Sequence, residues 1–495
     1  MLVPLVPLDA PLETARRLGV AGLLALGLPP DAPPPSAATL PLLATTPCLV
    51  GPFLPHNFAS AHAWLHAGAR LALLSLPPST PPDALAAAAR AAIASAALPP
   101  ERVLLLLEWP AEGLAAALGA LVESLAAPRG EGCFECTRAE TVGVAGGVLL
   151  CLPARGRREE LLAAVAGVAR ADRLKVIVAA AAVAGGGAKE VGALDKRGID
   201  VLARGVLDAA AAGGGGGEGG GGMAAVLRQV AEGAALEVGA CLAACCRTDR
   251  EDGLFATVVE ELGGGSLGLV YSSAESIRAA VRDGRGIYWS RSRGGLWRKG
   301  DSSGAWQTLH RIRLDCDHDA LRFTVTQHGE PPAFCHKASL TCWGEPGGLR
   351  ALQGMLYSRK RDAPAGSYTK RLFEDPKLLR NKLVEEAQEL AEAEEPDHVA
   401  SEAADLMYFA MVRCVAAGVG IAEIESHLDR RALKLQRRPG NDKKERNAAA
   451  EKILREAKGS SSPPQPAAPV QPRGSLLFPA AVLLIGLAAV VRSRG

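Results

Sequence analysis

The chain has 495 residues, more than a single hydrophobic core organises, so we expect two to four domains. Its 55 Lys+Arg nearly balance its 53 Asp+Glu, so the overall charge gives no argument for a nucleic-acid-binding protein. The eleven cysteines are an odd number, and the N-terminus lacks the basic region and unbroken apolar run of a secretory signal. We therefore expect reduced thiols and a cytoplasmic protein.

Residues 1–248 form a first region that is rich in Ala, Leu and Gly. Apolar runs at 103–107 and 175–179 are typical of buried strands, and Ala/Leu-rich stretches at 82–98 and 159–171 are typical of helices. The alternation of such strands and helices predicts an α/β domain with a parallel sheet.

Two further features of this region are less informative. The stretch 213–222 is nearly all glycine and predicts a flexible loop or linker; it lacks the Gly-Lys-Ser/Thr ending of a phosphate-binding loop. Cys133 and Cys136 form a CxxC pair, which suits redox or metal chemistry. No second pair has the partner spacing, so incidental thiols are the simpler interpretation.

The rest of the chain divides into four segments. Residues 252–348 contain alternating sequences such as 321–325, which predict half-buried strands in an α+β domain, and 349–440 predict an all-α domain. The segment 441–475 is charged and then Ser/Pro-rich, as in a disordered tether. The apolar tail at 476–495 contains a run of sixteen uncharged residues, fewer than a membrane span usually needs. An anchor in an intracellular membrane and an amphipathic packing tail both remain open.

The most informative stretch is Asp-Cys-Asp-His-Asp at 315–319. Alternate residues of a regular strand share a face, so we expect the carboxylates of Asp315, Asp317 and Asp319 on one side and Cys316 on the other. Hard carboxylate oxygens suit Mg²⁺. The segment therefore predicts a magnesium site, with a solvated acidic edge as the alternative.

Thiols near this segment indicate a second metal. Cys335 and Cys342 can join Cys316 in holding Zn²⁺ and leave a fourth position for water, the open position that distinguishes catalytic from structural zinc. Zinc lowers the pKa of its bound water from 15.7 to about 7, so the set points to metal-assisted hydrolysis. Three unrelated cysteines are the alternative.

A basic loop rich in hydroxyl groups precedes the metal segment and predicts a phosphate cradle, although such loops are often only solvated. Its tryptophans suit either stacking on a base or packing in the core. The candidate substrate-binding residues of this loop are Trp289, Ser290, Arg291, Ser292, Arg293, Lys299 and Ser303.

The runs GLVYSSAESI, WSRSRGGLWRKGDSSG, RIRLDCDHDALRF and FCHKASLTCW, which begin at Gly268, together resemble phosphoribosyl-AMP cyclohydrolase. The resemblance implies hydrolytic opening of an adenine ring in histidine biosynthesis, with Mg²⁺ at the three aspartates and Zn²⁺ at the three cysteines. It also implies a dimer in which Cys316 reaches the zinc site of the other subunit. His336 is the expected proton-transfer residue, with a packing role as the alternative.

Carboxylates recur at helical spacing in the third region. Glu385 and Glu389 are four residues apart, Glu386 and Glu389 are three apart, and Glu402 and Asp405 are three apart. Each pair therefore shares a helical face. Two such helices facing one another would hold divalent cations, because the like charges otherwise repel. A solvated charged face is the alternative that spacing alone favours.

The pattern E-E-x-x-E followed by E-x-x-D resembles the all-α pyrophosphohydrolase superfamily that includes phosphoribosyl-ATP pyrophosphohydrolase. The resemblance implies Mg²⁺ at Glu386, Glu389, Glu402 and Asp405, with Glu385 among the catalytic residues. The expected reaction is hydrolysis of the α–β phosphoanhydride, with neutralisation of the leaving pyrophosphate.

Together the two parts resemble the fungal-type trifunctional histidine biosynthesis protein without its histidinol dehydrogenase domain. That family carries an N-terminal extension that looks like a degenerate relative of a (β/α)₈ isomerase. Residues 183–201 resemble a barrel strand–loop–helix–strand unit. No catalytic pair is apparent there, so we expect residues 1–248 to be a non-catalytic domain, structural or regulatory, and the resemblance implies a degenerate barrel.

We therefore expect a bifunctional homodimeric hydrolase with Zn²⁺ and Mg²⁺ as cofactors. It would convert phosphoribosyl-ATP to phosphoribosyl-AMP and pyrophosphate, and then open the adenine ring of phosphoribosyl-AMP. A non-catalytic, membrane-tethered zinc-binding scaffold is the alternative from another class. A general nucleotide-clearing pyrophosphatase is a third reading, and it leaves the cysteines unexplained.

Overall fold

The computed structural model describes most of the chain up to the end of the helical region. The described residues are 2–28, 32–53, 57–75, 85–108, 147–151, 175–179, 187–206, 236–344 and 347–435. The CxxC pair, the helix expected at 159–171, the glycine-rich stretch, the tether and the apolar tail lie outside these residues.

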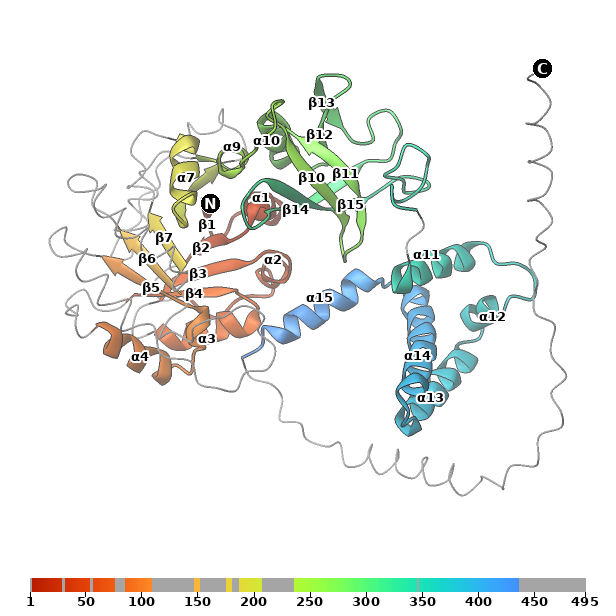
Figure 1. Cartoon of the computed structure of the whole chain (residues 1–495). Coiled ribbons are helices and arrows are strands. Elements are labelled where there is room, and N and C mark those ends of the chain that lie inside the picture. Colours follow the sequence, from red (N-terminus) through yellow and green to blue (C-terminus); the bar gives the residue numbers. More distant parts are fainter. Residues whose placement is uncertain are drawn as a thin grey trace, which may run out of the picture. The chain divides into compact units, whose positions relative to one another are not determined.

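A parallel sheet forms the N-terminal region, as predicted (Figure 1). Its strands follow one another in chain order, and β1 pairs with β8 as well as with β2, so the sheet closes on itself. The described strands are β1 (Leu2–Pro7), β2 (Leu24–Gly27), β3 (Cys48–Phe53), β4 (Leu71–Ser75), β5 (Val103–Glu108), β6 (Gly147–Cys151), β7 (Lys175–Ala179), β8 (Ile199–Val206) and the short β9 (Leu236–Glu237).

Side-chain alternation along these strands creates two apolar layers. One layer takes side chains from each of β1 to β8: Val3, Ala25, Leu49, Leu73, Leu104, Leu106, Leu149, Ile177 and Leu202. Intervening residues such as Leu24, Val50 and Leu105 join a second and larger cluster. Burial on both faces explains why the strands read as continuous apolar runs in the sequence.

Helices connect several of these strands. They are α1 (Leu12–Leu18), α2 (Leu40–Thr45), α3 (Phe58–Ala67), α4 (Leu85–Ser95), α7 (Gly187–Asp195) and α9 (Val238–Cys245). The helix expected at 82–98 is therefore confirmed as α4.

A six-stranded mixed sheet follows, with the order β13-β12-β11-β10-β15-β14. Its pairings are antiparallel except that of β10 with β15, which is parallel. The elements are β10 (Phe255–Glu261), β11 (Ser266–Ser272), α10 (Ala274–Asp283), β12 (Ile287–Ser290), β13 (Gly295–Arg298), β14 (Gln307–Leu314) and β15 (Ala320–Gln327). Buried and less buried residues alternate along β15, so the half-buried strand predicted at 321–325 is confirmed.

The metal segment 315–319 is a hairpin loop, not a strand, because β14 ends just before it and β15 begins just after it. The Ala320 N–H donates to Asp315 Oδ1 at 3.1 Å and closes the loop. His318 has a φ of +69°, in the left-handed region that a strand does not contain. The strand-face argument that separated the carboxylates from Cys316 is therefore wrong. Asp and His favour turns, which outweighed the alternation.

The last described region is all-α, as predicted. It comprises α11 (Gly348–Arg361), α12 (Tyr368–Glu374), α13 (Pro376–Glu392), α14 (Pro396–Ala416) and α15 (Ile421–Ala432). A separate apolar cluster that includes Leu356, Leu379 and Phe409 forms its core. No single helix among the described residues is long and apolar enough to span a membrane; α14 and α15 meet the length and composition criteria only as a pair, bent by 104°.

Two close helix approaches link α7 to α9 within the N-terminal region and α9 to α10 of the mixed-sheet region. A Cβ on Gly192 of α7 would lie 2.2 Å from the carbonyl oxygen of Ala244 in α9. A Cβ on Gly239 of α9 would lie 2.7 Å from Cα of Arg278 in α10. Glycine permits both approaches because it has no Cβ. The helices α7, α9 and α10 therefore form a packed series from one sheet toward the other.

Replacing Gly192 with alanine should separate α7 from α9, since the obstructing atom is backbone and cannot rotate away. We expect Gly192→Ala to lower the free energy of unfolding by about 1–3 kcal/mol, as overpacking does. Gly354→Ala is the matched control, because nothing lies within 4 Å of a Cβ at that position in α11. Thermal and urea unfolding of both variants measure the effect; equal stability of the two would contradict the close approach.

Candidate functional site

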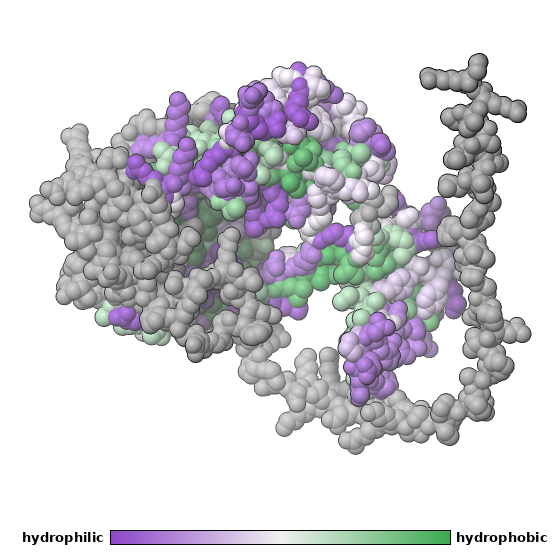
Figure 2. Space-filling view, viewed as in Figure 1, coloured by the Kyte–Doolittle hydropathy of each residue, from purple (hydrophilic) through white to green (hydrophobic). Residues whose placement is uncertain are grey.

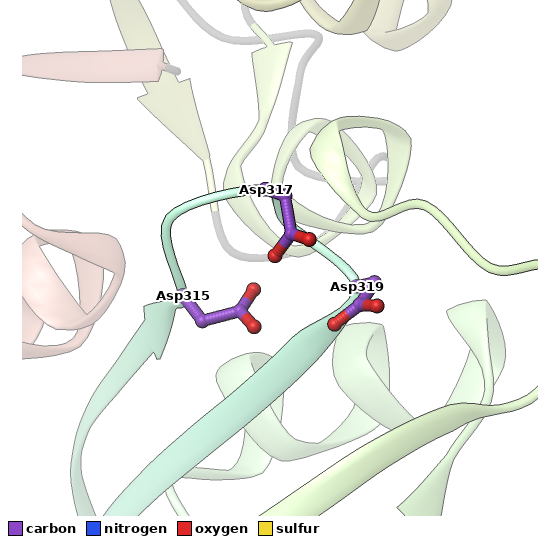
Figure 3. A group of neighbouring side chains, drawn as sticks. All are labelled: Asp315, Asp317 and Asp319. Carbon is purple, nitrogen blue, oxygen red and sulfur yellow. The ribbon is translucent and has the colours of Figure 1, made fainter.

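The hairpin between β14 and β15 brings the three predicted aspartates together. Figure 3 shows the carboxylates of Asp315, Asp317 and Asp319 turned toward the space that the hairpin encloses. One oxygen from each lies within 4.8 Å of the others, and all three residues are exposed. The charge of Asp317, supported by burial and by Asp315, raises the pKa of Asp319. A divalent cation would relieve this repulsion with the hard oxygen ligands that Mg²⁺ prefers.

Two of the three predicted zinc ligands are neighbours. Cys335 and Cys342 interact through their side chains. Hydrogen bonds from the Lys337 backbone N–H and the Ser339 side chain lower the pKa of Cys335 and favour its thiolate, the form that binds a metal. Burial raises the pKa of Cys342, and Cys335 adds to that shift.

Cys316 is not brought to this pair within one chain. It is exposed in the hairpin, and its Sγ lies 3.9 Å from Asp317 Oδ1. The metal-ligand groups found among the described residues contain carboxylates and no cysteine. One chain therefore supplies two neighbouring thiols, Cys335 and Cys342, and a third thiol, Cys316, that lies apart from them.

His336 is exposed next to the thiol pair. Its Nδ1 lies 3.9 Å from the Sγ of Cys335. This position leaves the imidazole open to solvent and to a substrate, as a proton-transfer residue requires.

The basic loop predicted as a phosphate cradle is largely a turn at the surface. Arg291, Ser292 and Arg293 are exposed between β12 and β13, and Figure 2 shows hydrophilic residues gathered over this part of the molecule. The Arg291 guanidinium lies 4.0 Å from the centre of the Tyr271 ring, a cation–π distance. Ser303 is also exposed, whereas Trp289 and Ser290 are half-buried.

Lys299 differs from the other candidates. It is only 5% exposed, and its Nζ donates to the carbonyl oxygens of Ala305 and Ala333 at 3.1 and 3.0 Å. Burial lowers the pKa of this ammonium, an effect that the charges of Cys342 and Cys335 oppose. Lys299 thus ties two backbone segments together, and its expected contact with a phosphate stays a prediction.

Three of the predicted acidic ligands meet between α13 and α14. One oxygen each from Glu386, Glu389 and Glu402 lies within 4.8 Å of the others. Glu386 is buried, Glu402 is half-buried and Glu389 is exposed. Burial, followed by the charges of Glu386 and Glu402, raises the pKa of Glu389. The three carboxylates thus lie close enough for one cation to contact all of them, and the cation site stays a prediction.

Glu385 and Asp405 lie on the same helices but outside this group. Both are exposed, and Glu385 Oε2 lies 2.9 Å from Lys382 Nζ. The three-residue spacing that placed Asp405 on the face of Glu402 is correct as helix geometry, while the assembled group contains Glu402 alone from α14.

Lys382 is a functional candidate that the sequence analysis did not assign. Its Nζ lies 2.8 Å from Glu386 Oε1 and 5.5 Å from the centre of the Phe409 ring. Hydrogen bonds to Glu386, the largest cause, and to Glu385 raise the pKa of Lys382. The signal was present in the sequence, since Lys382 precedes Glu385 by three residues and Glu386 by four.

Two family models match consecutive parts of the chain. Residues 268–344 match the model of phosphoribosyl-AMP cyclohydrolase, and residues 349–432 match that of phosphoribosyl-ATP pyrophosphohydrolase. The bifunctional protein HisIE of Parasynechococcus marenigrum is 34% identical over 200 residues, which cover 36% of this chain and 89% of that protein. The chain belongs to the family of bifunctional histidine biosynthesis proteins.

Fungal proteins of this family are more similar in sequence. The histidine biosynthesis bifunctional protein his7 of Schizosaccharomyces pombe is 54% identical, over 40% of this chain and 46% of that protein. The trifunctional protein of Neurospora crassa is 51% identical, over 43% of this chain and 24% of that protein. The chain thus spans less than half the length of these fungal relatives. A tryptophan synthase structure from Mycobacterium tuberculosis aligns at 14% identity over 41% of this chain and 81% of that chain, with a TM-score of 0.26, too low to support an argument.

In this family member, Lys382 should stabilise the metal-free pyrophosphohydrolase domain. Lys382→Met leaves the buried Glu386 without the ammonium, so we expect the free energy of unfolding to fall by about 1–2 kcal/mol. Added Mg²⁺ should restore more stability to the variant than it adds to the wild type.

Thermal unfolding with and without Mg²⁺ measures both effects. Lys377→Met is the control, since this lysine is exposed on the same helix. A variant at Lys382 that unfolds like the control would contradict the role of its ammonium.

Proposed function

We propose that the chain hydrolyses phosphoribosyl-ATP to phosphoribosyl-AMP and pyrophosphate in its helical domain, and then opens the adenine ring of phosphoribosyl-AMP in its mixed-sheet domain. One observation carries the proposal. Each of the two segments that match an enzyme family contains one compact carboxylate cluster. The first segment contains the hairpin aspartates, and the second contains the glutamates of α13 and α14. The scaffold reading is less favoured, because both clusters are assembled.

The side chains at both sites are of the types that bind metal ions. The three hairpin aspartates and the three clustered glutamates supply oxygen ligands for Mg²⁺, with Asp405 as a further ligand one turn along α14. Cys335 and Cys342 supply thiolates for Zn²⁺. When bound, such cations act as Lewis acids that acidify water and neutralise developing phosphate charge.

The chain's own side chains have complementary tasks. His336, exposed beside the thiols, would accept or return a proton at its imidazole during ring opening. Arg291 and Arg293, with the neighbouring serines, would bind the substrate phosphate at the turn between β12 and β13. Glu385 would take part in pyrophosphate release in the helical domain, where its ion pair with Lys382 holds it beside the glutamate cluster.

We further propose that the active cyclohydrolase is a homodimer in which each zinc site takes Cys316 from the second copy. Its separation from the other two thiols within one chain supports this arrangement, because a catalytic zinc usually takes three protein ligands. The described cysteines are free thiols, which fits a reducing cytoplasmic compartment.

The N-terminal region would serve as a non-catalytic scaffold. We propose that its closed parallel sheet is a degenerate (β/α)₈-like barrel, since eight strands pair in sequence, the first meets the eighth, and each gives a side chain to one inner apolar layer.

The two activities should be separable by mutation. Starting from phosphoribosyl-ATP with Mg²⁺ and Zn²⁺, Cys342→Ala should lose ring opening by on the order of 100-fold and keep pyrophosphate release. Glu389→Ala should lose pyrophosphate release by a similar factor and still open the ring of supplied phosphoribosyl-AMP. Product analysis by chromatography separates the two steps.

Matched controls exist on the same elements. Cys414→Ala in α14 and Glu392→Ala in α13 lie outside both clusters and should retain both activities. Wild-type protein that runs neither reaction would reject the proposed function. Loss of both reactions in either active-site variant would argue against two separate sites.

Subunit mixing tests the shared zinc site. Cys316→Ala and Cys342→Ala should each be inactive in ring opening alone. After unfolding and refolding together, half of the dimers are mixed and one of the two sites in each is intact, so about a quarter of wild-type activity should return. No recovery, in preparations whose mixed dimers are verified by mass spectrometry of tagged chains, would contradict the exchange of Cys316.

A further inference from the structure

The aspartate hairpin is held by a residue from the N-terminal region. Asp195 ends α7, and its side chain is only 6% exposed. His318 stands between two of the hairpin aspartates, and its Nδ1 lies 2.8 Å from Asp195 Oδ2. The histidine side chain is itself only 24% exposed, in a hairpin whose aspartates all face solvent. It therefore points inward, toward α7.

A second residue reinforces this contact. Arg247 follows α9, and its backbone N–H donates to the carbonyl of His318 at 2.8 Å. Its Nη1 donates to the carbonyl of Asp317 at 3.0 Å, and its Nη2 lies 3.9 Å from Asp195 Oδ2. Arg247 thus joins the hairpin backbone to the same carboxylate that His318 contacts.

The hairpin needs such support because its conformation is strained. The φ of +69° at His318 lies in the left-handed region, which costs roughly 1–2 kcal/mol for a residue with a Cβ. The backbone reversal at this residue lets Asp317 and Asp319 face Asp315 across the loop. Three carboxylates at this separation also repel one another. Strain of this kind persists only where the surroundings hold it.

The supporting residues lie at the ends of packed helices. Asp195 is the last residue of α7 and Arg247 follows α9, and these two helices approach closely at Gly192. The next helix, α10, is tied to this helix pair by Arg278, whose Nε and Nη2 both donate to the Glu237 carboxylate at 2.8 Å. The hairpin is therefore anchored to the end of one helix and to the segment that follows the next.

We propose that Asp195 is a positioning residue for the cyclohydrolase metal site: through His318 it holds the hairpin in the conformation that presents three carboxylates to one cation. This inference rests on the proposed function of the hairpin. It gives the N-terminal domain a definite part in ring opening through a residue that lies outside the aspartate cluster.

The test uses the full chain and Mn²⁺ as a paramagnetic probe for the magnesium sites. Asp195→Asn keeps the shape of the side chain and removes its charge. Binding followed by electron paramagnetic resonance should show one class of Mn²⁺ site weakened by about 10–100-fold, the usual effect of losing a residue that orients a ligand. The half-saturating Mn²⁺ concentration for ring opening should rise by the same factor, with most of the rate recovered at saturation.

The pyrophosphohydrolase site of the same chain is the internal control, and its Mn²⁺ requirement should not change. Glu237→Gln is the external control, because it breaks the ion pair to α10 without touching the hairpin. His318→Asn should reproduce the effect of Asp195→Asn, since asparagine tolerates the left-handed conformation but loses the imidazole. The double variant should be no weaker than either single variant.

The outcomes separate the two hypotheses. Wild-type chain without Mn²⁺-dependent ring opening would reject the proposed function itself. Wild-type chain that opens the ring, together with unchanged Mn²⁺ binding in Asp195→Asn, would reject the positioning role alone. An equal loss in Glu237→Gln would also reject it, because the effect would then reflect a loosened domain contact.

Discussion

Like charges that must lie close together are the constraint on which both sites depend. Six carboxylates in two groups bring their oxygens within 4.8 Å, and each group needs a scaffold that opposes the repulsion. The helical group uses regular geometry: α13 and α14 face each other, and Lys382 neutralises Glu386 from the preceding turn. In the described part of the chain, the hairpin aspartates form no ion pair with a lysine or arginine, so the hairpin relies on the contacts of His318 and Arg247. The mixed-sheet and helical domains thus oppose the repulsion between their carboxylates in different ways.

The sequence predicted the features that local periodicity encodes. Continuous apolar runs indicated the parallel sheet, alternation indicated β15, and three- and four-residue spacing placed Glu386 and Glu389 on one face of α13. The aspartates at 315–319 were rightly grouped for the wrong reason. Alternation was taken as strand geometry, whereas a turn with one left-handed residue brings them together. The composition of this segment, rich in Asp and without β-branched residues, already disfavoured a strand.

Contacts between distant parts of the chain could not be predicted in this way. Asp195 lies in a segment whose glycines and apolar residues suggested only a strand–helix unit, and nothing near it in sequence marks it as a partner of His318. Lys299 shows the same limit, because a lysine in a basic loop reads as exposed until the fold supplies two carbonyls and buries it. Periodicity reports which face a residue occupies and says nothing about which distant residue meets it.

Because it is buried, the contact of Asp195 with His318 should contribute more to stability than the exposed ion pairs of the same region. The pair of Arg250 with Asp252 has the shorter distance, 2.6 Å, but both side chains are more than a third exposed, and such pairs contribute about 0–1 kcal/mol. Asp195 is nearly excluded from water, so the loss of His318 would remove one of the contacts that offset the burial of its carboxylate. The N-terminal domain and the hairpin therefore stabilise each other: the domain holds the strained loop, and the loop satisfies a buried charge of the domain.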